Sequence, residues 1–165
     1  MQIACVVTYP NTALSNGCTD VTQTLTDIIV PGLSLAQGIG RWGNYFNMEA
    51  YGREITNPAW QFFPAGVQIP SGDGFAWHMA TFFYESCWDL LVFAVLWFII
   101  RKRSTKAGTT TLWYLLLYGM GRFFIEGLRT DSLMSGSIRV SQLLSLVLVI
   151  VSAAMLIVNA VKKKA

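Results

Sequence analysis

The chain has 165 residues, of which 53% are hydrophobic and only 13% charged, and its formal net charge is +3. Soluble globular domains carry about 25% charged residues, so this composition excludes an ordinary soluble domain. The basic residues gather at the ends of apolar segments, which relates the charge to membrane orientation rather than to nucleic-acid binding. The sequence therefore predicts an integral membrane protein.

The first 26 residues differ in character from the rest of the chain. They are mixed and polar, with turn signals at residues 9–11 and 15–17, and they lack the basic start and apolar core of a secretory signal. We interpret residues 1–26 as an atypical N-terminal segment and residues 27–165 as part of a polytopic membrane domain.

Three cysteines have no metal-ligand spacing. Cys87 lies in an apolar segment, where a buried thiol acts as a small hydrophobic group. Cys5 and Cys18 pair only if they face an oxidising compartment, and the sequence does not decide between the paired and the free forms.

A short apolar run, Asp27–Ile39, leads into a glycine-rich stretch, Gly38–Gly52. The run is too short to span a bilayer alone, so it predicts a partial helix that delivers the stretch to one membrane surface. Arg41 supplies a planar cationic fork suited to phosphate, and Asn44 follows at a spacing that shares one helical face. Two interpretations stay open: a polar site at membrane depth, or a turn with a snorkelling arginine.

The remaining chain alternates interfacial and apolar segments. Residues 53–74 are rich in proline, glycine and aromatic residues, which indicates loops at the headgroup level. Apolar segments at 80–100, 112–128 and 140–161 are long enough to be membrane helices. The expected fold is therefore an all-α integral membrane protein with three full transmembrane helices, a partial helix and interfacial loops.

Basic residues predict the orientation. Seven of them cluster after the first and third predicted spans, at residues 101–106 and 162–164. The positive-inside rule places both clusters and the C-terminus in the cytoplasm. Arg41, Glu85, Arg129 and Asp131 then share the outer side.

Two groups of charged residues lie within or beside these spans. Glu85 and Asp89 are four residues apart, and intramembrane carboxylates are costly, which favours a function for Glu85 and leaves Asp89 open between function and headgroup hydration. Arg122 and Glu126 have the spacing of a helical ion pair that fixes helix orientation. Arg129 is then a second outer-side arginine opposite Arg41, and the two suggest a site for an anionic headgroup.

Three motifs, in this order, carry a resemblance to a known family. They are Gly-Arg-x-Gly-Asn-Tyr-x-Asn-x-Glu with Tyr-Gly at 40–52, His-Met-Ala-Thr-Phe-Phe-Tyr-Glu at 78–85, and Tyr-Gly-Met-Gly-Arg-Phe-Phe-Ile-Glu-Gly-Leu-Arg-Thr-Asp-Ser at 118–132. The region from Asp27 to the C-terminus resembles bacterial prolipoprotein diacylglyceryl transferase. That family spans the membrane seven times, with an outer N-terminus and a cytoplasmic C-terminus.

The resemblance implies transfer of diacylglyceryl from phosphatidylglycerol to the lipobox cysteine thiol of prolipoproteins, in the bacterial inner membrane. It implies no metal or organic cofactor and no nucleic-acid partner. The expected catalytic positions are Arg41, Arg129 and Glu49. The expected substrate-binding positions are Arg41, Asn44, Asn47, Gly52, His78, Glu85 and Arg129.

The sequence also departs from the family. A His-Gly-Gly motif and the preceding spans are not recognisable in residues 1–26, so the chain resembles the C-terminal portion of the enzyme. We expect the chain alone to bind phosphatidylglycerol and to catalyse little transfer. The alternative functions are a non-catalytic phospholipid-binding membrane protein and a small transporter in which Glu85, Arg122 and Glu126 line a pathway.

Overall fold

The computed structural model describes residues 12–72, 74–103, 106–129, 134–135 and 138–164. Its helices are α2 (Thr12–Phe46), η1 (Pro58–Trp60), α3 (Thr81–Ala94), η2 (Val95–Ile100), α4 (Arg101–Arg103), α5 (Thr109–Glu126) and α6 (Val140–Lys164). Its strands are β1 (Gly66–Ser71), β2 (Gly74–Met79), β3 (Met134–Ser135) and β4 (Ile138–Arg139). Asp131, Cys5 and the side chain of Cys18 lie outside the described part.

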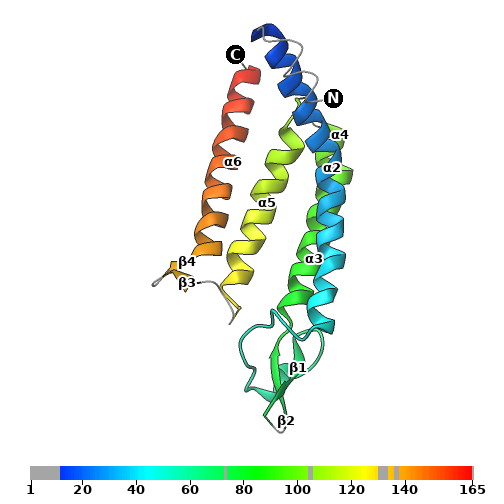
Figure 1. The fold of residues 1–165 in the computed structure, drawn as a ribbon, viewed down its shortest axis with the longest axis vertical. Coiled ribbons are helices and arrows are strands. Elements are labelled where there is room, and N and C mark those ends of the chain that lie inside the picture. The colour runs from blue at the N-terminus through cyan, green and yellow to red at the C-terminus, as the bar shows by residue number, and fades with distance from the viewer. Residues whose placement is uncertain (1–11, 73, 104–105, 130–133, 136–137, 165) are drawn as a thin grey trace.

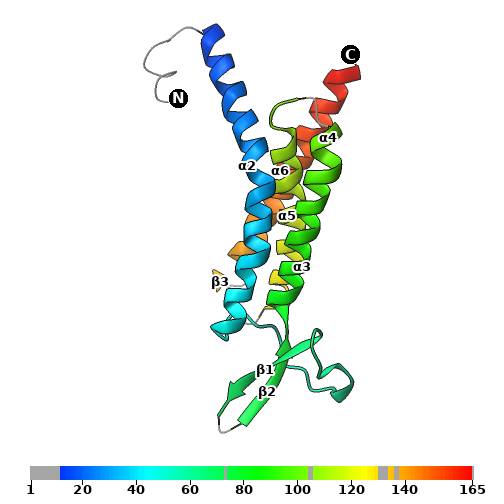
Figure 2. The same ribbon diagram turned by 90° about the vertical axis from the view of Figure 1, so that its right-hand side faces the viewer.

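The long helices run along a common direction (Figure 1). Helix α2 packs along α3, α5 packs along α6, and α5 also contacts both α2 and α3. The β1–β2 hairpin projects past the ends of α2 and α3, and the C-terminus lies at the opposite end of the bundle (Figure 2). We call these the hairpin end and the basic end, because the basic residues of α4 and the last turn of α6 lie at the latter.

Helix α2 is longer than the predicted partial helix. It runs without interruption through residue 26, and the turn expected at residues 15–17 is helical. Pro31 lies inside this helix, where it removes a backbone hydrogen bond. Packing against α3 offsets the cost: Pro31 is buried, and the Ser34 hydroxyl donates to the Asp89 carbonyl oxygen at 2.8 Å. Tertiary contacts thus extend a helix that the local signals would end.

The predicted spans are confirmed in part. In the described chain, two helices are long and apolar enough to cross a bilayer: Thr81–Arg103, which joins α3, η2 and α4, and Val140–Lys162 of α6. Helix α5 covers the second predicted span, at 112–128, over 18 residues, about 27 Å at 1.5 Å per residue. Cys87 on α3 is exposed rather than buried, so the thiol faces the surroundings of the bundle.

The all-α prediction is wrong at the hairpin end. Strands β1 and β2 pair antiparallel from Gly66↔Met79 to Ser71↔Gly74, and β1 lies within the region, residues 53–74, interpreted as loop. Residues 52–55, which precede β1 in the chain, also pair with β2. The Gly52 N–H donates to the Met79 carbonyl, and the Ile55 N–H donates to the Trp77 carbonyl. Proline and glycine in this region favour a loop, and the buried residues of β1, Gly66 and Ile69, are three apart, so no two-residue alternation reveals the strand.

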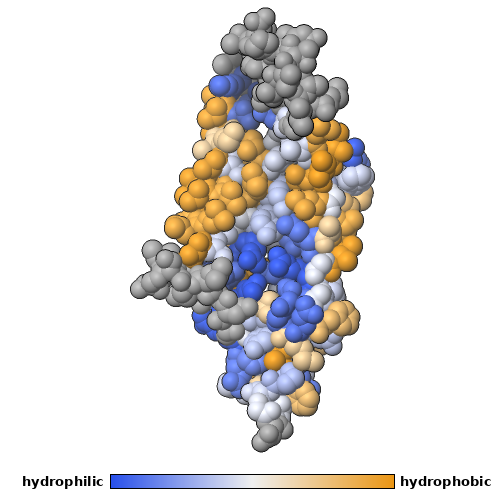
Figure 3. Space-filling view, viewed as in Figure 1, coloured by the Kyte–Doolittle hydropathy of each residue, from blue (hydrophilic) through white to orange (hydrophobic). Residues whose placement is uncertain are grey.

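The helices meet at small residues and leave apolar side chains outside. The core holds Val30, Val92, Leu96 and Tyr114. A methyl group added at Gly121 would overlap the indole of Trp88, so glycine is what lets α5 approach α3. Outward faces carry large exposed hydrophobic side chains, which form the two flanks of Figure 3. A surface of this kind is suited to lipid rather than to water.

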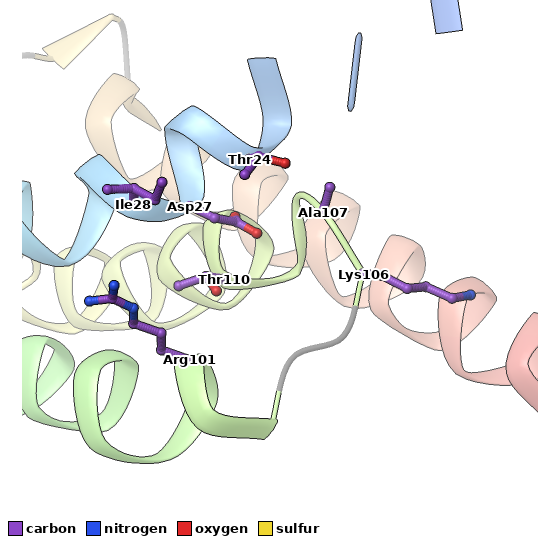
Figure 4. A pocket seen from close by; sticks show the side chains of 7 residues that line it. All are labelled: Thr24, Asp27, Ile28, Arg101, Lys106, Ala107 and Thr110. Carbon is purple, nitrogen blue, oxygen red and sulfur yellow. The ribbon is translucent and has the colours of Figure 1, made fainter. Parts of the chain in front are cut away.

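At the basic end, Asp27 of α2 caps the start of α5. Its Oδ2 accepts from the Gly108 backbone N–H at 2.8 Å, and its Oδ1 accepts from the N–H and the hydroxyl of Thr111 at 2.8 and 2.6 Å. Figure 4 shows Asp27 of α2 beside the start of α5, where Asp27 and Thr110 both line a pocket of about 270 Å³. The first N–H groups of a helix lack internal partners, so a carboxylate from a neighbouring helix satisfies them and complements the helix dipole.

Candidate functional site

Charged side chains from three helices meet inside the hairpin half of the bundle. We call this group the charge cluster: Arg41 from α2, Glu85 and Asp89 from α3, and Arg122 and Glu126 from α5. Residues spaced four apart share a helical face, so α3 and α5 each present two charged groups inwards. The three-helix packing then brings them together with Arg41.

Glu85 lies at the centre of the charge cluster. Its Oε2 is 3.1 Å from Nε of Arg41, and its Oε1 accepts a hydrogen bond from Nη1 of Arg122. Arg122 also approaches Oε2 of Glu126 at 3.1 Å, and Arg41 Nε is 3.8 Å from Oδ2 of Asp89. One carboxylate therefore holds together two arginines that would otherwise repel each other.

Because its carboxylates are buried, the stability of the charge cluster depends on every one of its charged members. The side chains of Glu85, Asp89 and Glu126 are only 3–4% exposed, whereas those of Arg41 and Arg122 are each 20% exposed. Removing one partner from such a group leaves an uncompensated charge, which is costly in low-dielectric surroundings. The accessible groups are thus the cationic ones, and a hydrophilic area opens between the apolar flanks of the molecule (Figure 3).

A second set of predicted residues gathers around Gly52. Gly52 forms an isolated β-bridge with Arg129, and its carbonyl oxygen is 3.0 Å from Nδ1 of His78. A methyl group at Gly52 would lie 2.8 Å from Cβ of Met79 and 2.9 Å from Cγ2 of Thr81. Only glycine therefore fits where the chain after α2 passes between β2 and the segment after α5.

The last turn of α2 carries Asn44, and the turn that follows α2 carries Asn47 and Glu49. The Asn47 amide donates to Oε1 of Glu49 at 3.1 Å, and both residues are exposed. The Glu49 backbone N–H donates to the Asn44 carbonyl at 3.0 Å. Met48 and Ala50 have φ values of 52° and 57°, which non-glycine residues rarely adopt. Such strain is retained where surrounding structure holds a functional segment in place.

The contacts sort the predicted site residues into two sets. Arg41 and Glu85 come together in the charge cluster, whereas Gly52, His78 and Arg129 meet at the β-bridge. The arginine that shares Glu85 with Arg41 is Arg122, which the sequence predicted only as the partner of Glu126. Sequence spacing reveals the Arg122–Glu126 pair within one helix, but no spacing rule reveals pairs between helices.

Two further features bear on what the site can bind. Among the described residues, no group of three His, Cys, Asp or Glu side chains could hold a metal ion. A pocket of about 460 Å³ lies between α3 and the hairpin end of the chain, and is lined mainly by residues of the 54–60 segment together with Ala65, Met79 and Tyr84.

The fold and the charge cluster define a helical membrane protein with a polar site near one end of its bundle. A sequence profile of the family described as "Prolipoprotein diacylglyceryl transferase" matches residues 8–158. The chain belongs to this family. Because the match begins at residue 8, it includes most of residues 1–26, the segment interpreted above as atypical.

Several relatives are named phosphatidylglycerol–prolipoprotein diacylglyceryl transferase. The protein of Fervidobacterium nodosum is 47% identical over 129 residues, which cover 78% of this chain and 44% of the relative. A Listeria innocua protein is 46% identical over 145 residues, with 84% and 50% coverage, and a Gloeobacter violaceus protein is 47% identical over 131 residues, with 79% and 49%. The chain thus spans about half the length of the curated relatives it matches. No solved structure matches it significantly.

Proposed function

We propose that the chain takes part in the transfer of diacylglyceryl from phosphatidylglycerol to the lipobox cysteine thiol of a prolipoprotein. The observation that carries the proposal is the charge cluster, in which two partly exposed arginines are held side by side by Glu85. Membership of the family and the names of its relatives supply the reaction.

The chemistry requires neutralisation of a leaving phosphate. The cysteine sulfur forms a bond to the glyceryl carbon, the bond from that carbon to the phosphate oxygen breaks, and the thiol proton is released. Charge therefore builds up on the departing glycerol phosphate, and preorganised cations stabilise such charge strongly. Arg41 and Arg122 are placed to do this, and a nearby positive charge also favours the thiolate.

Other residues have supporting roles in the proposal. Asn44 in the last turn of α2, and Asn47 and Glu49 on the strained turn after it, would contact the headgroup or the peptide. Gly52 allows the close chain passage that places this turn, with His78 and Arg129 beside it. Arg129 remains a proposed catalytic residue because it follows directly after α5, which carries Arg122.

The proposed orientation places the hairpin end outside the bacterial inner membrane. It counts α5 as a full span beside the two apolar helices, with the basic end and the C-terminus in the cytoplasm. The exposed basic residues Arg101–Arg103 and the direction of α6 support this arrangement.

Cysteine labelling tests the orientation. Ser71→Cys in the hairpin and Arg103→Cys in α4 would each be introduced into a chain in which Cys5, Cys18 and Cys87 are serine. An impermeant thiol reagent added to intact cells is expected to label the cysteine at 71 and to spare that at 103. The reverse result would contradict the orientation.

A mass-shift assay tests the reaction itself. A lipobox peptide is incubated in phosphatidylglycerol vesicles with the chain alone, and with the chain fused after the N-terminal half of the Fervidobacterium nodosum relative. The fused protein is expected to form a peptide heavier by one diacylglyceryl group, and the chain alone is expected to form little of it. The product should be absent when phosphatidylcholine replaces phosphatidylglycerol or when serine replaces the peptide cysteine. Phosphatidylglycerol binding without product in either protein would instead support a non-catalytic phospholipid-binding function.

A further inference from the structure

Asp89 is less well compensated than its neighbour Glu85. Glu85 contacts both arginines, at 3.1 Å from Arg41 Nε and through a hydrogen bond from Arg122. Among the residues that the structure describes, Asp89 forms an ion pair with Arg41 alone, at 3.8 Å, and its Oδ2 finds no hydrogen-bond partner there. Both side chains are almost completely buried, at 3% and 4% exposed. Asp89 thus has the burial of a paired carboxylate without its contacts.

The groups around Asp89 come from all three packed helices. Arg41 of α2, Glu85 of α3 and Arg122 of α5 act on it electrostatically, and Tyr114 of α5 is also close enough to interact. Arg122 pairs with Glu85 and Glu126, and Nε of Arg41 lies nearer to Glu85 than to Asp89, although within the described chain this Nε also makes no hydrogen bond. The Tyr114 hydroxyl is likewise engaged, since it donates to Gln37 at 2.9 Å.

A buried carboxylate that lacks an adequate partner becomes neutral by taking up a proton. We propose that Asp89 carries a proton in the resting protein, and that neutral Asp89 is a positioning residue that lets the charge cluster admit an anionic phosphate headgroup. With Asp89 neutral, Arg41 is balanced by Glu85 alone. With Asp89 ionised, a second carboxylate would face Arg41 and repel the phosphate.

The proton on Asp89 can be tested without reference to the headgroup. The proton on Asp89 follows from the contacts within the described chain and needs no particular reaction. The effect on the headgroup rests on the proposed function, because it supposes that phosphatidylglycerol binds at Arg41. The experiments separate these two claims.

Infrared difference spectroscopy tests the proton. The chain in phosphatidylcholine nanodiscs in mildly acidic buffer is expected to show the carbonyl stretching band of a protonated carboxylic acid, shifted in D2O. Asp89→Asn is expected to lose the band, whereas Glu54→Gln, at an exposed carboxylate, retains it. Absence of the band in the wild type, or its persistence in Asp89→Asn, would overturn the proposal.

The unfolding midpoint gives a second test of the proton on Asp89. An amide closely resembles a neutral carboxylic acid, so Asp89→Asn is expected to leave the unfolding midpoint near that of the wild type. Glu85→Gln makes the same change one helical turn away and is expected to lower the midpoint clearly, because two arginines lose a shared charge. Equal destabilisation by the two variants would show that Asp89 is ionised.

Phosphatidylglycerol binding tests the effect on the headgroup. Binding is followed as phosphatidylglycerol replaces phosphatidylcholine in the nanodiscs. Rising pH removes the proton from Asp89, so wild-type binding is expected to weaken severalfold, while Asp89→Asn binds equally well throughout. Wild-type binding as insensitive to pH as that of the variant overturns the headgroup role alone. Failure of both proteins to bind phosphatidylglycerol at neutral pH overturns the headgroup role and the proposed function together.

Discussion

The two ends of the bundle use charge in opposite ways. At the hairpin end, the carboxylates of the charge cluster are 3–4% exposed and contact arginines, Glu85 and Asp89 on other helices and Glu126 within α5. At the basic end, Arg101, Lys102, Arg103 and Lys106 are exposed. Arg101 there stacks over Trp97 at 4.5 Å, a contact that keeps its charge near solvent and headgroups.

This difference has a physical consequence for mutation. Exposed charges interact weakly and are screened, so their individual removal changes stability little. Buried charges depend on each partner, because a remaining charge cannot recover its hydration. Asp27 is the exception at the basic end, since it satisfies backbone N–H groups of α5 rather than forming a surface pair.

The largest expected effect comes from Glu85→Ala. The change leaves Arg41 and Arg122 side by side without the carboxylate between them, so we expect stability to fall by about 3–5 kcal/mol. Denaturant unfolding in detergent measures this. Glu54→Ala, at an exposed carboxylate of the hairpin end, is the control and should change stability by less than about 0.5 kcal/mol. Similar values for both variants would mean that burial does not distinguish these charges.

Arg41→Lys tests whether transfer needs the planar guanidinium of Arg41 or only its positive charge. Lysine keeps the charge but loses the planar fork, so we expect transfer to fall roughly 100-fold, equivalent to about 2.7 kcal/mol, without unfolding. Arg122→Lys should be milder. The matched control at the basic end is Arg101→Lys, which should leave the rate unchanged. The mass-shift assay compares all three, and equal tolerance of lysine at Arg41 and Arg101 would rule out bidentate phosphate recognition.

Gly121→Ala tests whether close helix approach holds the charge cluster together. The added methyl group overlaps the Trp88 indole, whose N–H donates to the Leu117 carbonyl at 3.0 Å, so α5 must move away from α3. We expect a loss of about 1–3 kcal/mol, measured by thermal unfolding. Gly32→Ala is the control, because nothing lies within 4 Å of the added group. A loss in the control that matched Gly121→Ala would exclude the steric explanation.

Asp27→Asn has the smallest expected effect. An asparagine keeps one acceptor oxygen but loses the charge at the start of α5, so we expect a loss of about 1 kcal/mol. Hydrogen exchange of the Gly108 and Thr111 amides should quicken, because these groups donate to Asp27. Lys102→Gln, at an exposed residue of the same end, should leave both amides protected. Unchanged exchange in Asp27→Asn would contradict the capping role.

Several features were accessible from sequence because they depend on local composition and spacing. Apolar length predicts the helices at 81–103 and 140–162, and a four-residue interval predicts the Arg122–Glu126 pair. The glycine-rich stretch is correctly singled out, since Gly52 lies where no side chain fits. The three motifs also led to the right family. These properties need no knowledge of which helix contacts which.

Other features appear only in the tertiary structure, because they arise between segments far apart in the chain. The extension of α2 through residue 26 and the burial of Pro31 depend on packing against α3. The pairing of β2 with residues 52–55 depends on where the chain returns after α2. Above all, the contact of Glu85 with both Arg41 and Arg122 joins three helices. Sequence determined which charges enter the apolar segments, and helix packing decided which of them would be partners, because a buried charge is stabilised only by groups that come within a few ångströms of it.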